Sequence, residues 1–218
     1  MNSELEIQRK YWDNEVQSFD SIYTHGKSDF SNWLDKKFRW DMYARFKYTI
    51  EKSKPISGKT FLDVGCGTGL YSIEFAKNNA SEVTGIDISD KMIKICQDRA
   101  EKENVKEKCK FHIGDLLTFN PEKKYDVVIG IGLFDYISKP YNVLKKMHDV
   151  SRDRAIFSFP RSTTWRAYLR KVRLTLRGCP VYFYSESQLE ELLKKAGFIR
   201  YESEILGQLF CITAFVNE

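Results

Sequence analysis

The sequence has no apolar run long enough to cross a lipid bilayer, no internal repeat and no low-complexity tract. Its first residues, MNSELEIQRKYWDNEV, are polar throughout and lack the charged, apolar and small order of a secretory signal. Cysteine is also scarce, and Cys66, Cys96, Cys109, Cys179 and Cys211 show no CxxC or other metal-ligand spacing. We therefore expect a cytoplasmic protein with reduced thiols and no metal ion.

The chain does have enough apolar material for one core. Its 218 residues are 42% hydrophobic and 14% aromatic, which fits a single α/β domain over residues 1–218. A helical segment is expected over 1–54, followed by alternating strands and helices to about residue 159. A capping box at Ser185 and Gln188 starts a later helix that stops at Gly197. Two final strands around Gly207 should pair antiparallel.

Residues 61–69 read FLDVGCGTG, an apolar run followed by glycines at every second position. Glycine adopts positive φ without strain and has no Cβ, so a ligand can approach the main chain closely. The helical pattern LYSIEFAKNN follows directly, as in a nucleotide-binding βαβ unit. A dinucleotide fingerprint would need its third glycine at Leu70, but this chain has Gly69 instead.

This acid-x-G-x-G-x-G form resembles the glycine loop of class I S-adenosylmethionine-dependent methyltransferases. The resemblance implies a Rossmann-like, seven-stranded sheet that is mostly parallel, with an antiparallel C-terminal strand and helices on both faces. It also implies S-adenosyl-L-methionine as the cofactor. The residues expected to contact the cofactor are Asp63, Gly65, Cys66, Gly67, Gly69, Asp87, Ile88, Asp115, Leu116, Ile131 and Tyr11.

Three further strands carry these residues. SEVTGIDIS (81–89) ends in Asp87, whose carboxylate can accept hydrogen bonds from both ribose hydroxyls. KCKFHIGDLLTF (108–119) places Asp115 just past a strand, where the resemblance puts the adenine. YDVVIGIGLFDYI (125–137) is nearly continuous in apolar residues, as expected of a strand buried on both faces.

Several of these positions also have a structural interpretation. Asp63 either contacts the cofactor or caps the helix and binds loop amides. Asp87 and Asp115 are also common turn residues. Cys66 is favoured as a small residue that the loop needs for steric reasons, rather than as a nucleophile.

The N-terminal segment is rich in aromatic residues, most of which should pack in the core. In related methyltransferases such a leader folds over the cofactor, so the resemblance implies a lid over 1–54 in which Tyr11 or Tyr23 reaches the methionine end. The sequence does not identify the catalytic residues, and His25, Tyr23 and Tyr136 are the candidates to test.

Positive charge is concentrated in an inserted segment, residues 160–184, which the resemblance implies is a lid over the acceptor site. Between Asp153 and Glu186 lie seven basic residues and no acid, and removing them takes the formal net charge from +5 to −2. Within 163–177, apolar and arginine positions alternate at helical spacing, which predicts a basic amphipathic helix. Its partner is an anionic substrate, an anionic membrane surface or RNA, unless the helix is an ordinary solvated face.

We expect methyl transfer to a small-molecule acceptor that is anionic or aromatic. The insertion resembles that of magnesium-protoporphyrin O-methyltransferases, whose substrate is an apolar macrocycle with carboxylates. The alternatives are an RNA-modifying methyltransferase, in which the arginines contact phosphates, and a non-catalytic protein that binds S-adenosylmethionine. No NPPY-type string follows the fourth strand, which argues against methylation of nucleobase amino groups. The oligomeric state cannot be read from the sequence.

Overall fold

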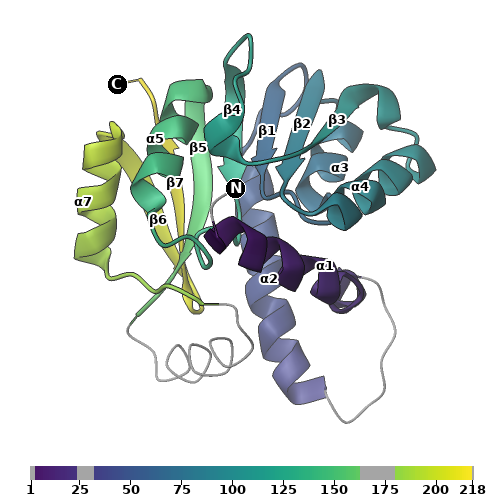
Figure 1. The fold of residues 1–218 in the computed structure, drawn as a ribbon. Coiled ribbons are helices and arrows are strands. Elements are labelled where there is room, and N and C mark those ends of the chain that lie inside the picture. The colour runs from purple at the N-terminus through teal and green to yellow at the C-terminus, as the bar shows by residue number, and fades with distance from the viewer. Residues whose placement is uncertain (1–2, 24–31, 163–179, 218) are drawn as a thin grey trace.

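The computed structural model describes the backbone of residues 3–23, 32–162 and 180–217. Within the first two helices it describes the side chains of residues 5–16, 40 and 42–52. Figure 1 shows a twisted sheet with helices packed against both of its faces.

The sheet has seven strands in the order β3-β2-β1-β4-β5-β7-β6. The strands are β1 (Thr60–Val64), β2 (Glu82–Asp87), β3 (Cys109–Ile113), β4 (Tyr125–Gly130), β5 (Ser151–Pro160), β6 (Arg200–Leu206) and β7 (Leu209–Phe215). Pairs among β1 to β5 are parallel, whereas β7 runs antiparallel to both β5 and β6. The expected fold, mostly parallel with one reversed C-terminal strand, is confirmed.

The helices are α1 (Ser3–Tyr23), α2 (Asn32–Lys52), α3 (Leu70–Lys77), α4 (Asp90–Lys102), α5 (Pro140–Val150) and α7 (Glu186–Ala196), with short 3-10 turns η2 (Lys106–Lys108) and η3 (Leu116–Thr118). The expected capping box starts α7: Ser185 Oγ accepts from the Gln188 N–H, and the Gln188 side chain accepts from the Ser185 N–H. Gly197 ends the helix at a φ of +103°.

Successive side chains of a strand point to opposite faces of the sheet, so alternate residues pack in two different apolar layers. Leu62 and Val128 pack in one layer with Leu144 of α5 and Leu193 of α7. On the other face Phe61 stacks on Phe75 of α3 with ring centroids 4.1 Å apart, in a layer that also contains Tyr48 of α2. Burial of both faces explains the continuous apolar sequence of β4.

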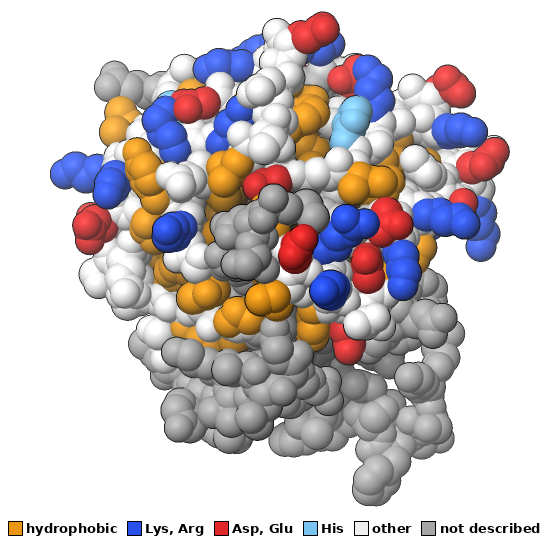
Figure 2. Space-filling model, viewed as in Figure 1, with side chains coloured by type: hydrophobic (Ala, Val, Ile, Leu, Met, Phe, Trp, Pro, Cys, Tyr) orange, Lys and Arg blue, Asp and Glu red, His pale blue; other side chains and the backbone are white. Residues whose placement is uncertain are grey.

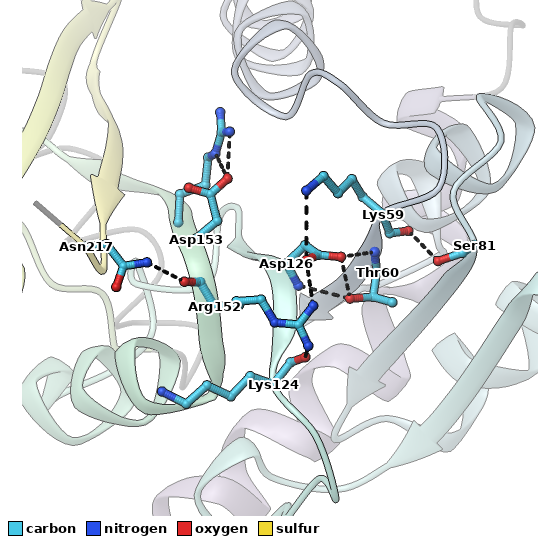
Figure 3. A network of polar contacts seen from close by, with 9 residues as sticks. Lys59, Thr60, Ser81, Lys124, Asp126, Arg152, Asp153 and Asn217 are labelled. Atoms are coloured by element: carbon cyan, nitrogen blue, oxygen red, sulfur yellow. Dashed lines mark hydrogen bonds and ion pairs between the residues drawn. The ribbon is translucent and has the colours of Figure 1, made fainter.

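The two ends of the sheet differ in character. At the amino ends of β1, β4 and β5, Asp126 accepts hydrogen bonds from the backbone N–H of Thr60 (2.8 Å) and from Arg152 Nη1 (2.9 Å), as Figure 3 shows. This polar network joins three strands that are far apart in sequence. The carboxyl ends lie at the lower edge in Figure 1, where α1 crosses the sheet.

The edge strand β6 is exposed along nearly its whole length. Glu202 and Glu204 lie on the side of α2, where both pair with Lys52. Tyr201 and Ile205 are 37% and 53% exposed.

Candidate functional site: a glycine loop at the carboxyl edge

The glycine loop leaves β1 and enters α3 through three positive φ angles, +69° at Gly65, +54° at Gly67 and +79° at Gly69. Residues other than glycine rarely adopt these backbone angles, which explains the spacing of the glycines. The N–H groups of Gly65 and Cys66 both donate to the Ile86 carbonyl, at 2.8 and 3.1 Å. The loop is therefore tied to the end of β2, its neighbour in the sheet.

Asp87 ends β2 and faces this loop. Its Oδ2 accepts from the Gly67 N–H and its Oδ1 from the Ser89 N–H, both at 2.9 Å. Burial raises the pKa of this carboxyl, and the backbone N–H groups of Ser89 and Gly67 oppose the rise because they favour the ionised form. A carboxylate has about four lone-pair positions, so further acceptor capacity is left for a ligand's hydroxyl groups.

Asp63 is almost completely buried, with 2% of its surface exposed. Its Oδ2 accepts from Ser72 Oγ of α3 at 2.7 Å. Burial raises its pKa to about 7, with the hydrogen bond from Ser72 opposing and the charge of Asp87 adding to the rise. Of the two roles that the sequence left open, this geometry favours fixing α3 to the strand behind the loop.

Cys66 packs under the loop, with its Sγ 3.9 Å from Cys96 Sγ of α4. Cys96 Sγ donates to the Gly67 carbonyl at 3.0 Å. The hydrogen bond that Cys66 donates to Cys96 Sγ, together with burial, holds the pKa of Cys66 well above its usual value, so the thiol stays protonated at neutral pH. A Cβ on Gly85 would lie 3.0 Å from Cys66 Sγ, which shows how closely this layer is packed.

Asp115 lies after β3, as expected, and caps η3 by accepting from the Leu117 N–H at 3.1 Å. Leu116 is buried, whereas Ile113 and Leu117 are 59% and 43% exposed. An acid flanked by exposed apolar side chains can hold a flat heterocycle that has a polar edge. The Gly114 N–H donates to the Asp87 carbonyl at 2.8 Å, which keeps this corner beside the acid of β2.

The fourth strand is shorter than the sequence suggested. β4 ends at Gly130, and Gly132 turns the chain at a φ of +76°. The Gly132 N–H donates to Ser158 Oγ of β5 at 2.9 Å instead of continuing the strand. Ile131 packs partly against the α2 and α3 layer, and the segment up to Tyr136 is a loop at the carboxyl edge.

Arg45 of α2 is a residue that the sequence did not single out. Its Nη1 lies 3.2 Å from the point that a Cβ on Gly132 would occupy, so a guanidinium stands beside the turn after β4. Charged residues recur along the whole of this helix, so the spacing of Arg45 does not mark it as a site residue. Only the packing of α2 against this turn places it at the site.

The helix α1 crosses the carboxyl edge and contacts both sides of the site (Figure 1). Trp12 meets the ring of Tyr136 edge to face with centroids 5.0 Å apart, and Tyr11 packs on Trp12 at 5.2 Å. Ser89 Oγ donates to Asp13 Oδ1 at 2.6 Å. Tyr11 and Tyr136 are thus both near the site, while the Tyr23 side chain, His25 and the basic segment 163–177 lie outside the described residues.

Figure 2 shows charged side chains of both signs over most of this face, with apolar side chains between them and in a row across its lower middle. The described residues contain no group of three or more His, Cys, Asp or Glu that could hold a metal ion. No helix within the described part of the chain is long and apolar enough to span a membrane.

The chain is similar to known methyltransferases in sequence and in structure. The family model of a methyltransferase domain matches residues 56–197. The ubiquinone biosynthesis O-methyltransferase of Nitrosomonas europaea is 30% identical over 177 residues, which are 76% of this chain and 74% of the relative. The chloroplastic magnesium protoporphyrin IX methyltransferase of Arabidopsis thaliana is 27% identical over 204 residues, 88% of this chain and 64% of the relative.

Among solved structures, the magnesium protoporphyrin IX methyltransferase of Synechocystis with bound S-adenosylhomocysteine superposes with a TM-score of 0.80. It is 23% identical, and the match covers 97% of this chain and 99% of that one. The chain belongs to the class I S-adenosylmethionine-dependent methyltransferases. It is therefore an enzyme, and its cofactor is S-adenosyl-L-methionine.

Proposed function

We propose that the enzyme transfers a methyl group to a small acceptor with an apolar, aromatic body and negative charge. The proposal rests on two features of the carboxyl edge of the sheet. An aromatic pair, Trp12 and Tyr136, lies there, and the guanidinium of Arg45 lies beside the turn after β4. An aromatic wall favours a flat apolar partner, and a guanidinium favours a carboxylate or another oxyanion.

Each expected cofactor residue receives a role in this proposal. The main chain of Gly65, Cys66, Gly67 and Gly69 lies along the methionine portion, because the positive φ angles leave the backbone bare. Asp87 and Ile88 bind the ribose, and Asp115 and Leu116 bind the adenine. Ile131 and Tyr11 border the methyl-bearing end, and Asp63 acts from behind the loop through Ser72.

Arg45 is a further residue of the proposed site. Its place beside Gly132 suits a carboxylate, which either the cofactor's methionine end or the acceptor supplies. Two of the relatives act, by their names, in ubiquinone biosynthesis and on magnesium protoporphyrin IX. Both names favour a small organic acceptor over RNA for this chain. The seven basic residues between Asp153 and Glu186 favour an anionic one.

S-adenosylmethionine, when bound, supplies a methyl group on a positively charged sulfur that is a good leaving group. The task of the chain is then to align the acceptor and to exclude water, which α1 does by covering the carboxyl edge. Alignment alone supplies up to roughly 7–11 kcal/mol in well-oriented systems. A general base is needed only where the acceptor must lose a proton, and Tyr136 and the two candidates outside the described residues stay the ones to test.

Calorimetry and a transfer assay test the proposal together. S-adenosylhomocysteine should bind and NAD should not. Radiolabelled S-adenosylmethionine should then methylate carboxylated aromatic acceptors, including a carboxylated porphyrin, in preference to their neutral esters. Equal rates with acids and esters would contradict the proposal that the acceptor is anionic. Transfer to RNA alone would contradict the proposal that the acceptor is a small molecule.

We also propose that residues 1–218 act as a single domain in the cytoplasm, with 1–54 and 160–184 as its covering segments. Fractionation of cells that express the tagged chain tests the location. Limited proteolysis with and without S-adenosylhomocysteine tests the organisation, because a covering segment should be protected by the ligand.

A further inference from the structure

The helix α1 is held at both sides of the site. On the β4 side, Gln8 Nε2 donates to the Tyr136 carbonyl at 2.5 Å and Trp12 packs on the Tyr136 ring. On the β2 side, Asp13 Oδ1 accepts from Ser89 Oγ at 2.6 Å. In Figure 1 the helix lies across the lower edge of the sheet.

The contact on the β2 side leads directly to the proposed ribose-binding acid. Ser89 is completely buried, and its N–H donates to Asp87 Oδ1 at 2.9 Å while its hydroxyl donates to Asp13. The other oxygen of Asp87 accepts from Gly67 of the glycine loop. Three short hydrogen bonds therefore connect α1, the start of α4, Asp87 and the loop.

Ser89 is oriented by this arrangement. Its Oγ also accepts from the Met92 N–H at 3.2 Å as the N-cap of α4, so its single proton is directed to Asp13. A hydrogen bond to a carboxylate at a buried hydroxyl is stronger than one between neutral groups. The nearby Arg9 contacts to Asp13 (3.9 Å) and Asp90 (3.7 Å) are long and come from an exposed arginine, so they contribute little.

We propose that Asp13 is a positioning residue that controls exchange of the cofactor. Its hydrogen bond to Ser89 keeps α1 closed over the site and fixes the N–H that holds Asp87. This inference rests on the proposed cofactor site, in which the ribose lies at Asp87. A cofactor bound there leaves only when the contact between α1 and Ser89 opens, so the strength of this bond sets the dissociation rate.

The test measures dissociation of S-adenosylhomocysteine by stopped-flow displacement. Asp13→Ala removes the acceptor and should accelerate dissociation by about tenfold or more, from the typical strength of a hydrogen bond to a charged group. Asp13→Asn keeps a neutral acceptor oxygen and should fall between Asp13→Ala and the unaltered protein. It also serves if the alanine variant does not fold. Asn14→Ala, at an exposed neighbour on the same helix, is the matched control and should leave the rate unchanged.

A second measurement separates positioning from general stability. Asp13→Ala leaves the buried Ser89 hydroxyl without its carboxylate acceptor and should lower the thermal midpoint of the cofactor-free protein. Dissociation is therefore compared far below the midpoint of every variant, where all of them are folded, so that any acceleration reports the contact and not unfolding. An unchanged dissociation rate in Asp13→Ala overturns the inference, and so does equal acceleration by Asn14→Ala. Failure of the unaltered protein to bind S-adenosylhomocysteine rejects the cofactor site instead, so the two failures are distinguishable.

Discussion

At the scale of single residues, Asp87 is the acid on which the cofactor site depends. Replacing it with alanine should weaken S-adenosylhomocysteine binding by about 1.5–3 kcal/mol, through loss of charged hydrogen bonds to the ribose. Calorimetry measures the change, and Asp98→Ala, an exposed acid on α4, is the control. Full affinity in a folded Asp87→Ala variant would show that the ribose lies elsewhere.

Gly67→Val should be more damaging than Asp87→Ala, because a branched side chain is strained at a φ of +54° and occupies ligand space. The same titration compares the two variants. Affinity retained in Gly67→Val would mean that the ligand does not approach the loop closely.

Because of Asp63, we expect an unusual pH dependence of the free energy of unfolding. Its pKa is raised to about 7 in the folded protein by burial, so between about pH 4 and 7 the folded state binds more protons than the unfolded state. This contribution to stability is complete below the unfolded pKa and is lost as the pH rises toward 7. Asp63→Asn should flatten that part of the profile, as measured by urea unfolding at several pH values. A profile unchanged by the substitution would contradict the burial of a titrating group.

At the scale of elements, the amino ends of β1, β4 and β5 are joined through Asp126 (Figure 3). Burial opposes ionisation of this carboxyl, but hydrogen bonds from Thr60 and the charges of Lys59 and Arg152 hold its pKa below the usual value. Its contribution to stability is therefore present above the unfolded pKa and is lost as the pH falls through the folded one.

Asp126→Ala should lower the free energy of unfolding by about 1–3 kcal/mol, because two donors on Thr60 lose their acceptor. Asp149→Ala, which breaks an exposed pair with Lys145 on α5, should change it by under about 0.5 kcal/mol. Cofactor affinity should be unchanged in both, since these residues lie away from the carboxyl edge. Weaker cofactor binding in Asp126→Ala would show that strand alignment reaches the site.

The basic segment is an element known only from the sequence. Replacing Arg166, Arg170, Arg173 and Arg177 with glutamine should raise the KM for an anionic acceptor and remove its salt dependence, with cofactor affinity unchanged. If the segment serves RNA, the variant instead flattens a slope of roughly −0.7 in log K against log salt per phosphate contact. If it serves a membrane, only the unaltered protein sediments with anionic vesicles. If the variant matches the unaltered protein in all three assays, the arginines bind none of these partners and form an ordinary solvated face.

At the scale of the whole molecule, a ligand that binds only the folded state stabilises it. S-adenosylhomocysteine at about 100 times its dissociation constant should add about 2.7 kcal/mol and raise the thermal midpoint, whereas NAD should not. A thermal midpoint that rises with NAD alone would contradict the inference, drawn from the position of Gly69, that the cofactor is not a dinucleotide.

The sequence predicted the succession of strands along the chain and the glycine loop because both depend on local signals. Positive φ selects glycine at Gly65, Gly67 and Gly69, and an acid follows the next strand. The end of β4 was misplaced because Ile131 continues the apolar run although Gly132 turns the chain. The bond between Asp13 and Ser89 and the approach of Arg45 to Gly132 join distant residues, and no local pattern encodes them.

The exposed strand β6 bears on how copies of the protein behave toward one another. An unpaired edge presents free N–H and C=O groups that invite a strand from a second molecule, and charged side chains discourage such pairing. Glu202 and Glu204, neutralised only in part by Lys52, place charge along this edge, while Tyr201 and Ile205 supply apolar surface beside it. Resistance to aggregation thus depends on two glutamates that take no part in the chemistry, and acidic solution, which protonates them, is the condition under which edges should begin to join.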